Sequence, residues 1–159
     1  MLINHYNQSV HDYSNRVCRF VDKLLLDSAT AKDITQEAYL RLWENRHTVD
    51  FNKVRAWLFT TSYRLSMDHI KQKKRFDAEE YIPEGSIEQE NPDLKKVIHD
   101  ALSLLTEQQK SIILLKDYEG YSYEEIGEIL QLSESQVKVY LFRARKKIKE
   151  YIGDLKLVL

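Results

Sequence analysis

The sequence is poor in the residues that tight turns and covalent cross-links require. Among its 159 residues are four Gly, two Pro and one Cys. A β-rich fold needs many Gly- and Pro-containing turns, so this composition favours helices. The single Cys18 excludes an internal disulfide, and its apolar helical surroundings predict a small buried hydrophobe.

The sequence also lacks targeting and membrane-anchoring segments, and it lacks the motifs of common active sites. There is no signal peptide and no apolar run of about 18 residues, so we expect a cytoplasmic protein without membrane insertion. There is no HExxH sequence, no Cys/His cluster and no Gly-rich phosphate loop. The five His are scattered. We therefore expect no enzyme, and no metal site, cofactor or small-molecule substrate.

The net charge of −1 conceals three segments of different charge. Residues 1–75 carry 13 basic and 8 acidic side chains, whereas residues 76–93 carry 7 acidic and no basic ones. Residues 94–159 carry 11 basic and 10 acidic side chains. The middle segment holds both Pro residues and lacks an apolar period, which predicts an acidic linker that either stays solvated or covers a basic surface. Because nucleic acids respond to local clusters of positive charge, the net charge does not argue against DNA binding.

Apolar residues at helical spacing predict three helices in residues 1–75. The first spans residues 1–28 and buries one apolar stripe. The second begins with Thr30 as its cap and has Asp33 as the acidic residue three positions later. Its outer side is polar, and a solvated surface is the simplest interpretation of that side.

The third predicted helix runs from Val54 to about Arg75 and ends in a basic run. Its outer side carries aromatic residues, and aromatic rings stack on unpaired bases while cations follow the phosphates. A basic C-terminus also suits the helix dipole, so the charge alone is weak support. In the loop before this helix, Phe51 is either a staple onto the helix or a surface aromatic that contacts a ligand. The sequence leaves both open.

Three capping boxes predict the helices of the second domain. They pair Thr106 with Gln109, Ser122 with Glu125, and Ser133 with Gln136. An earlier helix is expected to begin with Asn91 as N-cap and Pro92 at the first helical position, with Leu94 in its apolar stripe. The last two helices are separated by little more than Gln131 and Leu132, which is typical of a helix-turn-helix. The prediction is therefore an all-α chain of two small helical domains joined by the acidic linker.

The last helix has an unusual outer face. Four apolar residues at helical spacing define its buried side: Val137, Leu141, Ala144 and Ile148. The opposite side carries basic residues together with Val139 and Phe142, which a solvated helix would normally exclude. In a DNA major groove, apolar groups contact the thymine methyl while Lys and Arg reach guanine or phosphate. We therefore predict a DNA recognition helix.

Three long stretches carry a more specific signal. They are DITQEAYLRLWENR, AWLFTTSYRLSMDHIKQKKR and LTEQQKSIILLKDYEGYSYEEIGEILQLSESQVKVYLFRARKKI. Together they resemble RNA polymerase sigma factors of the extracytoplasmic-function (ECF) class. The resemblance implies that residues 1–75 are sigma region 2, residues 76–93 the linker, and residues 94–159 sigma region 4. It also implies core RNA polymerase and promoter DNA as partners, and leaves open whether an anti-sigma factor binds.

The resemblance further implies roles for individual residues. Core polymerase would bind Asp33, Gln36, Glu37, Leu40, Arg41 and Trp43. The −10 element, held as melted single strand, would contact Phe51, Phe59, Tyr63, Arg64, Lys71, Lys73, Lys74 and Arg75. The −35 element, read as duplex, would contact Ser135, Gln136, Lys138, Val139, Phe142, Arg143 and Lys146. Capture of an extruded base offsets the cost of opening DNA, and no nucleotide hydrolysis is implied.

The chain departs from the family pattern at both DNA sites. Many members carry Asn at the position of Arg64, and a small residue and an Arg where Val139 and Tyr140 stand. No particular promoter sequence is therefore carried over to this chain.

Two other functions fit parts of the sequence. A helix-turn-helix regulator with an amino-terminal effector domain would bind duplex DNA without polymerase docking. Its first domain would show a pocket-lining apolar set, whereas this one shows a basic, aromatic helix. A helical enzyme could place a metal near Asp33 and Glu37, but the common metal-binding sequences are missing.

Overall fold

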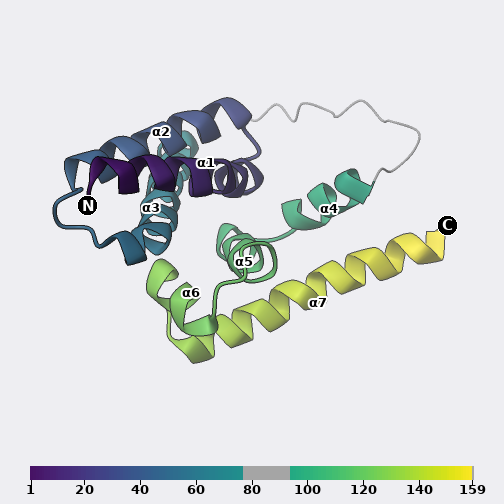
Figure 1. Ribbon diagram of the computed structural model, residues 1–159. Helices are drawn as coiled ribbons and strands as arrows, with labels where there is room; N and C mark the ends of the chain where they lie inside the picture. Colours follow the sequence, from purple (N-terminus) through teal and green to yellow (C-terminus); the bar gives the residue numbers. More distant parts are fainter. Residues whose placement is uncertain (77–93, 159) are drawn as a thin grey trace. The chain divides into compact units, whose positions relative to one another are not determined.

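The computed structural model describes residues 1–76 and 94–158, with side chains as far as residue 154. Every regular element in this part of the chain is helical, which confirms the predicted all-α class (Figure 1). Two compact units form, one chiefly from the helices up to Phe76 and one chiefly from those after residue 93. Residues 77–93 of the predicted linker, with the expected cap at Asn91, lie outside the described residues. None of the described helices is long and apolar enough to cross a membrane.

Three long helices build the first unit. They are α1 (Ile3–Leu25), α2 (Ser28–Glu44) and α3 (Val54–Phe76), with the short 3-10 helix η1 (Phe51–Lys53) directly before α3. Each long helix packs against the other two. The three helices expected from the apolar spacing are therefore present.

Aromatic and small polar side chains share the core of this unit. Phe20 on α1 packs edge-on against Phe59 on α3 with ring centroids 5.4 Å apart, and both side chains are almost fully buried. Ser62 and Ser66 on α3 are buried as well. Their hydroxyls donate to the carbonyls of Phe59 and Ser62 in the same helix. Because those bonds are made within the helix, the serines can face the core without an unsatisfied polar atom.

The helix α2 begins earlier than its sequence pattern predicts. Its N-cap is Asp27, whose carboxylate accepts hydrogen bonds from the Thr30 backbone N–H at 3.1 Å and the Thr30 hydroxyl at 2.7 Å. These bonds lower the pKa of Asp27. The predicted Thr30 cap is wrong because Asp is the stronger N-cap residue of the two. Leu26, with a left-handed φ of 57°, ends α1 directly before this cap.

Four short helical segments and one long helix build most of the described part of the second unit. They are α4 (Leu94–Ser103), α5 (Glu107–Ile113), the π-helical η3 (Leu114–Tyr118), α6 (Tyr123–Leu130) and the long α7 (Glu134–Val158). All three predicted capping boxes form, and each makes its two reciprocal hydrogen bonds at 2.9–3.2 Å. The helix-turn-helix is therefore α6 followed by α7.

Two backbone features shape the turn between α6 and α7. Gln131 has a left-handed φ of 58°, and the Leu132 N–H donates to the Gly127 carbonyl at 2.9 Å. A Cβ added to Gly127 would lie only 2.6 Å from the Leu132 carbonyl oxygen. Glycine at residue 127 therefore lets the turn fold back closely onto α6.

The π-helical turn η3 is a feature that the sequence pattern does not predict. The Glu119 N–H donates to the Leu114 carbonyl five residues earlier, at 3.0 Å, so the helix that begins after Thr106 does not continue here as a regular α-helix. Such wide turns are rare and are frequently found at functional sites. Gly120, with a φ of 73°, follows the segment.

Candidate functional site

The capping box at the start of α7 fixes where the candidate recognition helix begins. The Gln136 side-chain oxygen accepts from the Ser133 N–H at 2.9 Å, and the Gln136 N–H donates to the Ser133 hydroxyl at 3.1 Å. Gln136 is exposed, but its amide oxygen is engaged in this cap. Its first role in the structure is therefore to hold the helix start.

The buried side of α7 follows the predicted spacing. Val137, Leu141 and Ala144 are almost completely buried, whereas Ile148 is half-buried. The other predicted DNA contacts of this helix are exposed: Ser135, Lys138, Val139, Phe142, Arg143 and Lys146. Val139 is 45 % exposed and Phe142 68 % exposed. Apolar and basic side chains thus share one solvent-facing side of a helix-turn-helix.

Tyr123, in the first turn of α6, lies beside this face and was missed by the sequence reasoning. The Lys116 ammonium lies 4.4 Å from the centre of its ring, and the Lys138 ammonium 5.4 Å from it. Lys138 also forms an ion pair with Glu134 at 3.4 Å. The only sequence signal was an aromatic residue directly after the cap at Ser122, which by itself fits a surface position.

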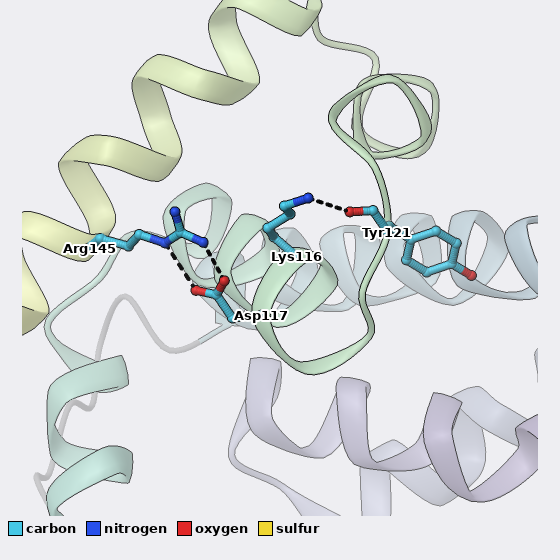
Figure 2. Close-up of polar contacts among 4 residues, drawn as sticks. All are labelled: Lys116, Asp117, Tyr121 and Arg145. Atoms are coloured by element: carbon cyan, nitrogen blue, oxygen red, sulfur yellow. Dashed lines mark hydrogen bonds and ion pairs between the residues drawn. The ribbon is translucent and has the colours of Figure 1, made fainter.

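A hollow of about 670 Å³ lies along the basic side of α7. Its lining includes Tyr123 from α6 and, from α7, Lys138, Phe142, Arg145, Lys146 and Lys149. Arg145 and Lys149 were not among the predicted contacts. Arg145 is engaged with Asp117 of η3, where its Nε lies 3.3 Å from one carboxylate oxygen and a terminal nitrogen bonds the other (Figure 2). This pairing raises the pKa of the Arg145 guanidinium.

The predicted polymerase face lies along the outer side of α2. Asp33, Gln36, Leu40 and Arg41 are exposed and Glu37 is half-buried. The Arg41 Nε donates to the Glu37 carboxylate at 3.0 Å, with both side chains close to half exposed. Leu40 is 51 % exposed. The face therefore combines a solvent-accessible ion pair with an exposed apolar side chain.

Trp43 is placed differently from the rest of that set. It is half-buried, with its ring 5.1 Å from that of Tyr6 on α1 and 4.1 Å from the Arg46 guanidinium. The Arg46 side chain also donates to the Trp43 carbonyl at 2.8 Å. Trp43 therefore anchors the end of α2 against α1.

Phe59 corrects one predicted DNA contact. The sequence reasoning placed it on the outer side of α3, but it is fully buried against Phe20. The predicted exposure of Phe59 is wrong because α3 packs on both other helices of its unit, so its buried side is wider than one stripe. Tyr63 is half-buried, and the remaining predicted contacts of α3 are exposed: Arg64, Lys71, Lys73, Lys74 and Arg75.

Phe51 is held by the first helix. Its ring stacks on that of His5 with centroids 4.4 Å apart and planes inclined by 22°, and both side chains are half-buried. The stack ties η1 to α1, and η1 also packs on α3. Both uses of Phe51 that the sequence left open stay predictions.

No group of three or more His, Cys, Asp or Glu residues able to hold a metal ion occurs in the described part of the chain. Asp33 and Glu37 thus have no such cluster around them within those residues. The arrangement offers exposed cations, aromatic rings and one polar helix face, which are suited to binding macromolecules.

Two family models match the chain. Sigma-70 region 2 matches residues 10–76, and Sigma-70, region 4 matches residues 95–148. Among curated proteins, the ECF RNA polymerase sigma factor SigM of Bacillus subtilis is 28 % identical, over 86 % of this chain and 88 % of its own length. SigW of the same organism is 27 % identical, over 90 % and 86 %.

Solved structures support the same fold. The sigma factor RpoE of Bartonella quintana, in complex with the anti-sigma factor NepR, matches with a TM-score of 0.83 and 20 % identity over 95 % of this chain and 98 % of that one. CnrH, in complex with the cytosolic domain of CnrY, matches with a TM-score of 0.71 and 18 % identity over 94 % and 88 %. At these identities the likeness concerns the fold.

Proposed function

The chain belongs to the ECF class of sigma-70 factors and directs promoter-specific transcription by RNA polymerase, and we propose that its two units divide promoter recognition between them. The unit of residues 1–75 binds core polymerase and the melted −10 element, and the unit of residues 94–159 reads the −35 element as duplex. Members of this family are non-catalytic. We infer that this chain likewise supplies binding energy alone and works in the cytoplasm, where its polymerase is.

The observation that carries the duplex assignment is the exposed face of α7. Val139 and Phe142 would lose contact with water in a major groove, while Lys138 and Arg143 are free of the helix core and long enough to reach bases or phosphates. A helix exposed only to water would gain nothing from these two apolar residues.

We assign the melted strand to α3 and the loop before it. The exposed basic residues between Lys71 and Arg75 follow the phosphates, while Tyr63 and Phe51 offer aromatic faces for unpaired bases. Arg64, exposed on the same helix, is a phosphate or base contact. Phe59 is left out of this site because it is buried.

We assign core polymerase to the outer side of α2. The Glu37–Arg41 pair and Gln36 supply charge and hydrogen bonds, and Leu40 supplies an apolar contact. Each unit then gains effective concentration at its own promoter element once polymerase fixes the spacing between them. The free protein is expected to bind promoters weakly for that reason.

Initiation by reconstituted polymerase tests the whole proposal. Core polymerase should start transcription from a shared two-part promoter in a genomic fragment library only when this protein is added. The Glu37→Lys variant should lose capture of core polymerase, because it places a like charge beside Arg41. The Asp68→Lys variant makes the same charge change at an exposed position of α3 and should retain capture. Equal capture by both variants would remove α2 as the docking face.

A second measurement separates base reading from backbone contact on α7. Lys138→Ala and Arg143→Ala should each weaken binding to the selected promoter by about 1–3 kcal/mol if they read bases. If only the salt dependence changes, they contact phosphate. Lys147→Ala is the matched control, because its ammonium bonds Gln109 at 3.3 Å within the second unit.

An anti-sigma factor is a further proposed partner. RpoE and CnrH were each captured in complex with another protein, named an anti-sigma factor in the case of NepR. Purification of this chain from its own cells should yield a stoichiometric second protein that competes with core polymerase. Recovery of the chain with polymerase subunits alone would argue against such a partner.

A further inference from the structure

One arginine beside the proposed duplex-reading face is already paired with a carboxylate. Arg145 on α7 bonds both oxygens of Asp117 in η3 (Figure 2). The two residues are 28 positions apart in sequence, and their side chains are 48 % and 37 % exposed. The pair therefore connects two elements while remaining accessible to solvent.

Arg145 also shares a hollow with residues assigned to DNA. Lys138, Phe142 and Lys146 line the same hollow on α7. A planar guanidinium binds a phosphate in the same two-pronged way in which it binds a carboxylate. By position and by chemistry, Arg145 would be a phosphate ligand if Asp117 did not hold it.

The segment that carries Asp117 is itself tied down. The Lys116 ammonium donates to the Tyr121 carbonyl at 3.2 Å (Figure 2). It also lies over the Tyr123 ring. Leu114 and Leu115, in the same π-helical turn, are buried. The Asp117 carboxylate therefore projects from a fixed backbone.

We propose that Asp117 is a specificity-determining residue, which keeps Arg145 from binding backbone phosphates at random DNA sequences. This inference rests on the proposed duplex reading by α7. Non-specific affinity comes from cations that replace counterions on the phosphates, and a cation that a carboxylate has neutralised contributes little to it. Arg143 remains available, and the pair that Lys138 forms with Glu134 leaves both side chains more than half exposed, so the balance shifts from general attraction toward the contacts that depend on sequence.

A purely structural role explains the pair less well. Exposed ion pairs contribute on the order of 0–1 kcal/mol to stability, and α7 is already held by Val137, Leu141 and Ala144 in the core. The two roles predict opposite results when Asp117 loses its charge. A structural brace would weaken DNA binding when removed, whereas a restraint on Arg145 would strengthen it.

The test uses the full-length chain with Asp117→Asn and a short mixed-sequence duplex over a range of salt concentrations. The dependence of log affinity on log salt should steepen by about 0.9, the value for one added phosphate contact. Affinity for the mixed duplex at low salt should rise several-fold. For polymerase holoenzyme on the selected promoter the gain should be smaller, so the ratio of promoter to mixed-sequence affinity should fall.

A double-mutant cycle with Arg145→Gln isolates the arginine. In the Arg145→Gln background, Asp117→Asn should leave the salt dependence unchanged. An equal steepening in both backgrounds would attribute the effect to long-range charge and overturn the proposal. Weaker binding of Asp117→Asn to both DNAs would overturn it in favour of a structural brace.

The behaviour of the wild-type holoenzyme distinguishes a failure of this inference from a failure of the proposed function. If wild-type holoenzyme initiates at the selected promoter and the cycle shows no coupling, only the role of Asp117 fails. If wild-type holoenzyme does not initiate, the proposed function fails first.

Discussion

The two units of this chain hold their helices in place by different means. The first unit uses long helices of 23, 17 and 23 residues whose aromatic rings pack on one another, and the N-cap of α1, Leu2, makes no side-chain capping hydrogen bond. The second unit uses helices as short as 7 and 8 residues, and α5, α6 and α7 each begin with a reciprocal capping box. Isolated helices of that length are unstable in water, so local caps matter more there. Packing dominates the first unit, and local hydrogen bonds set the boundaries of the second.

The largest effect should come from Phe59→Ala, which tests whether packing stabilises the first unit. Removing a fully buried Phe should lower the free energy of unfolding of the first unit by about 3–5 kcal/mol. Both tryptophans, Trp43 and Trp57, lie in this unit, so urea unfolding followed by their fluorescence reports on it. Phe76→Ala is the control, because Phe76 is 84 % exposed. Unchanged stability together with weaker binding to melted DNA would instead restore Phe59 as a DNA contact.

In the second unit, a large loss of stability should follow from an added side-chain atom at Gly127, where α6 lies close to the Leu132 backbone. Gly127→Ala places a Cβ against the Leu132 carbonyl and should cost about 1–3 kcal/mol. Hydrogen exchange of the α6 and α7 amides should detect this loss without a matching change in α1. Gly153→Ala is the counterpart on α7, where nothing lies within 4 Å of the added Cβ. It should stabilise its helix by about 0.5–1 kcal/mol, since Gly is a poor helix interior residue.

A smaller effect should distinguish the charged N-cap residue Asp27 from the uncharged N-cap residues of the second unit, Thr106, Ser122 and Ser133. Its folded-state pKa is lowered, chiefly by the Thr30 hydroxyl and N–H. Its contribution to stability is therefore present above the unfolded-state pKa and is lost as pH falls through the folded-state value. Asp27→Asn keeps a capping oxygen but does not titrate. Unfolding midpoints should favour the wild type at neutral pH, and that advantage should disappear in acid. A constant difference at all pH values would show that the charge is irrelevant.

The same contrast explains which parts of the structure were predictable. The capping boxes are local signals three residues apart, and all three formed where Thr106, Ser122 and Ser133 predicted them. Phe59 could not be placed from sequence, because two packing partners widen the buried side of α3. The cap at Asp27 was missed because Thr30, three residues later, offers a weaker version of the same signal.

The candidate site shows the same division. The exposed face with Val139 and Phe142 follows directly from the helical period of α7. The Asp117–Arg145 pair and the lysines around Tyr123 join residues distant in sequence through a π-helical turn. The apolar spacing of the sequence does not indicate such a turn, because one extra residue in a helix displaces the spacing by a single position.

That turn has a consequence for how the gene can change. A π-helical turn holds one residue more than an α-helical turn, so deletion of a single codon within Leu114–Tyr118 can be absorbed by closing this turn to an ordinary α-helical one. The helix faces on either side would be kept, while the place of Asp117 inside the turn, and with it the contact to Arg145, would change. A one-codon deletion at this point is therefore an evolutionary route to altering this contact without replacing any residue of α7.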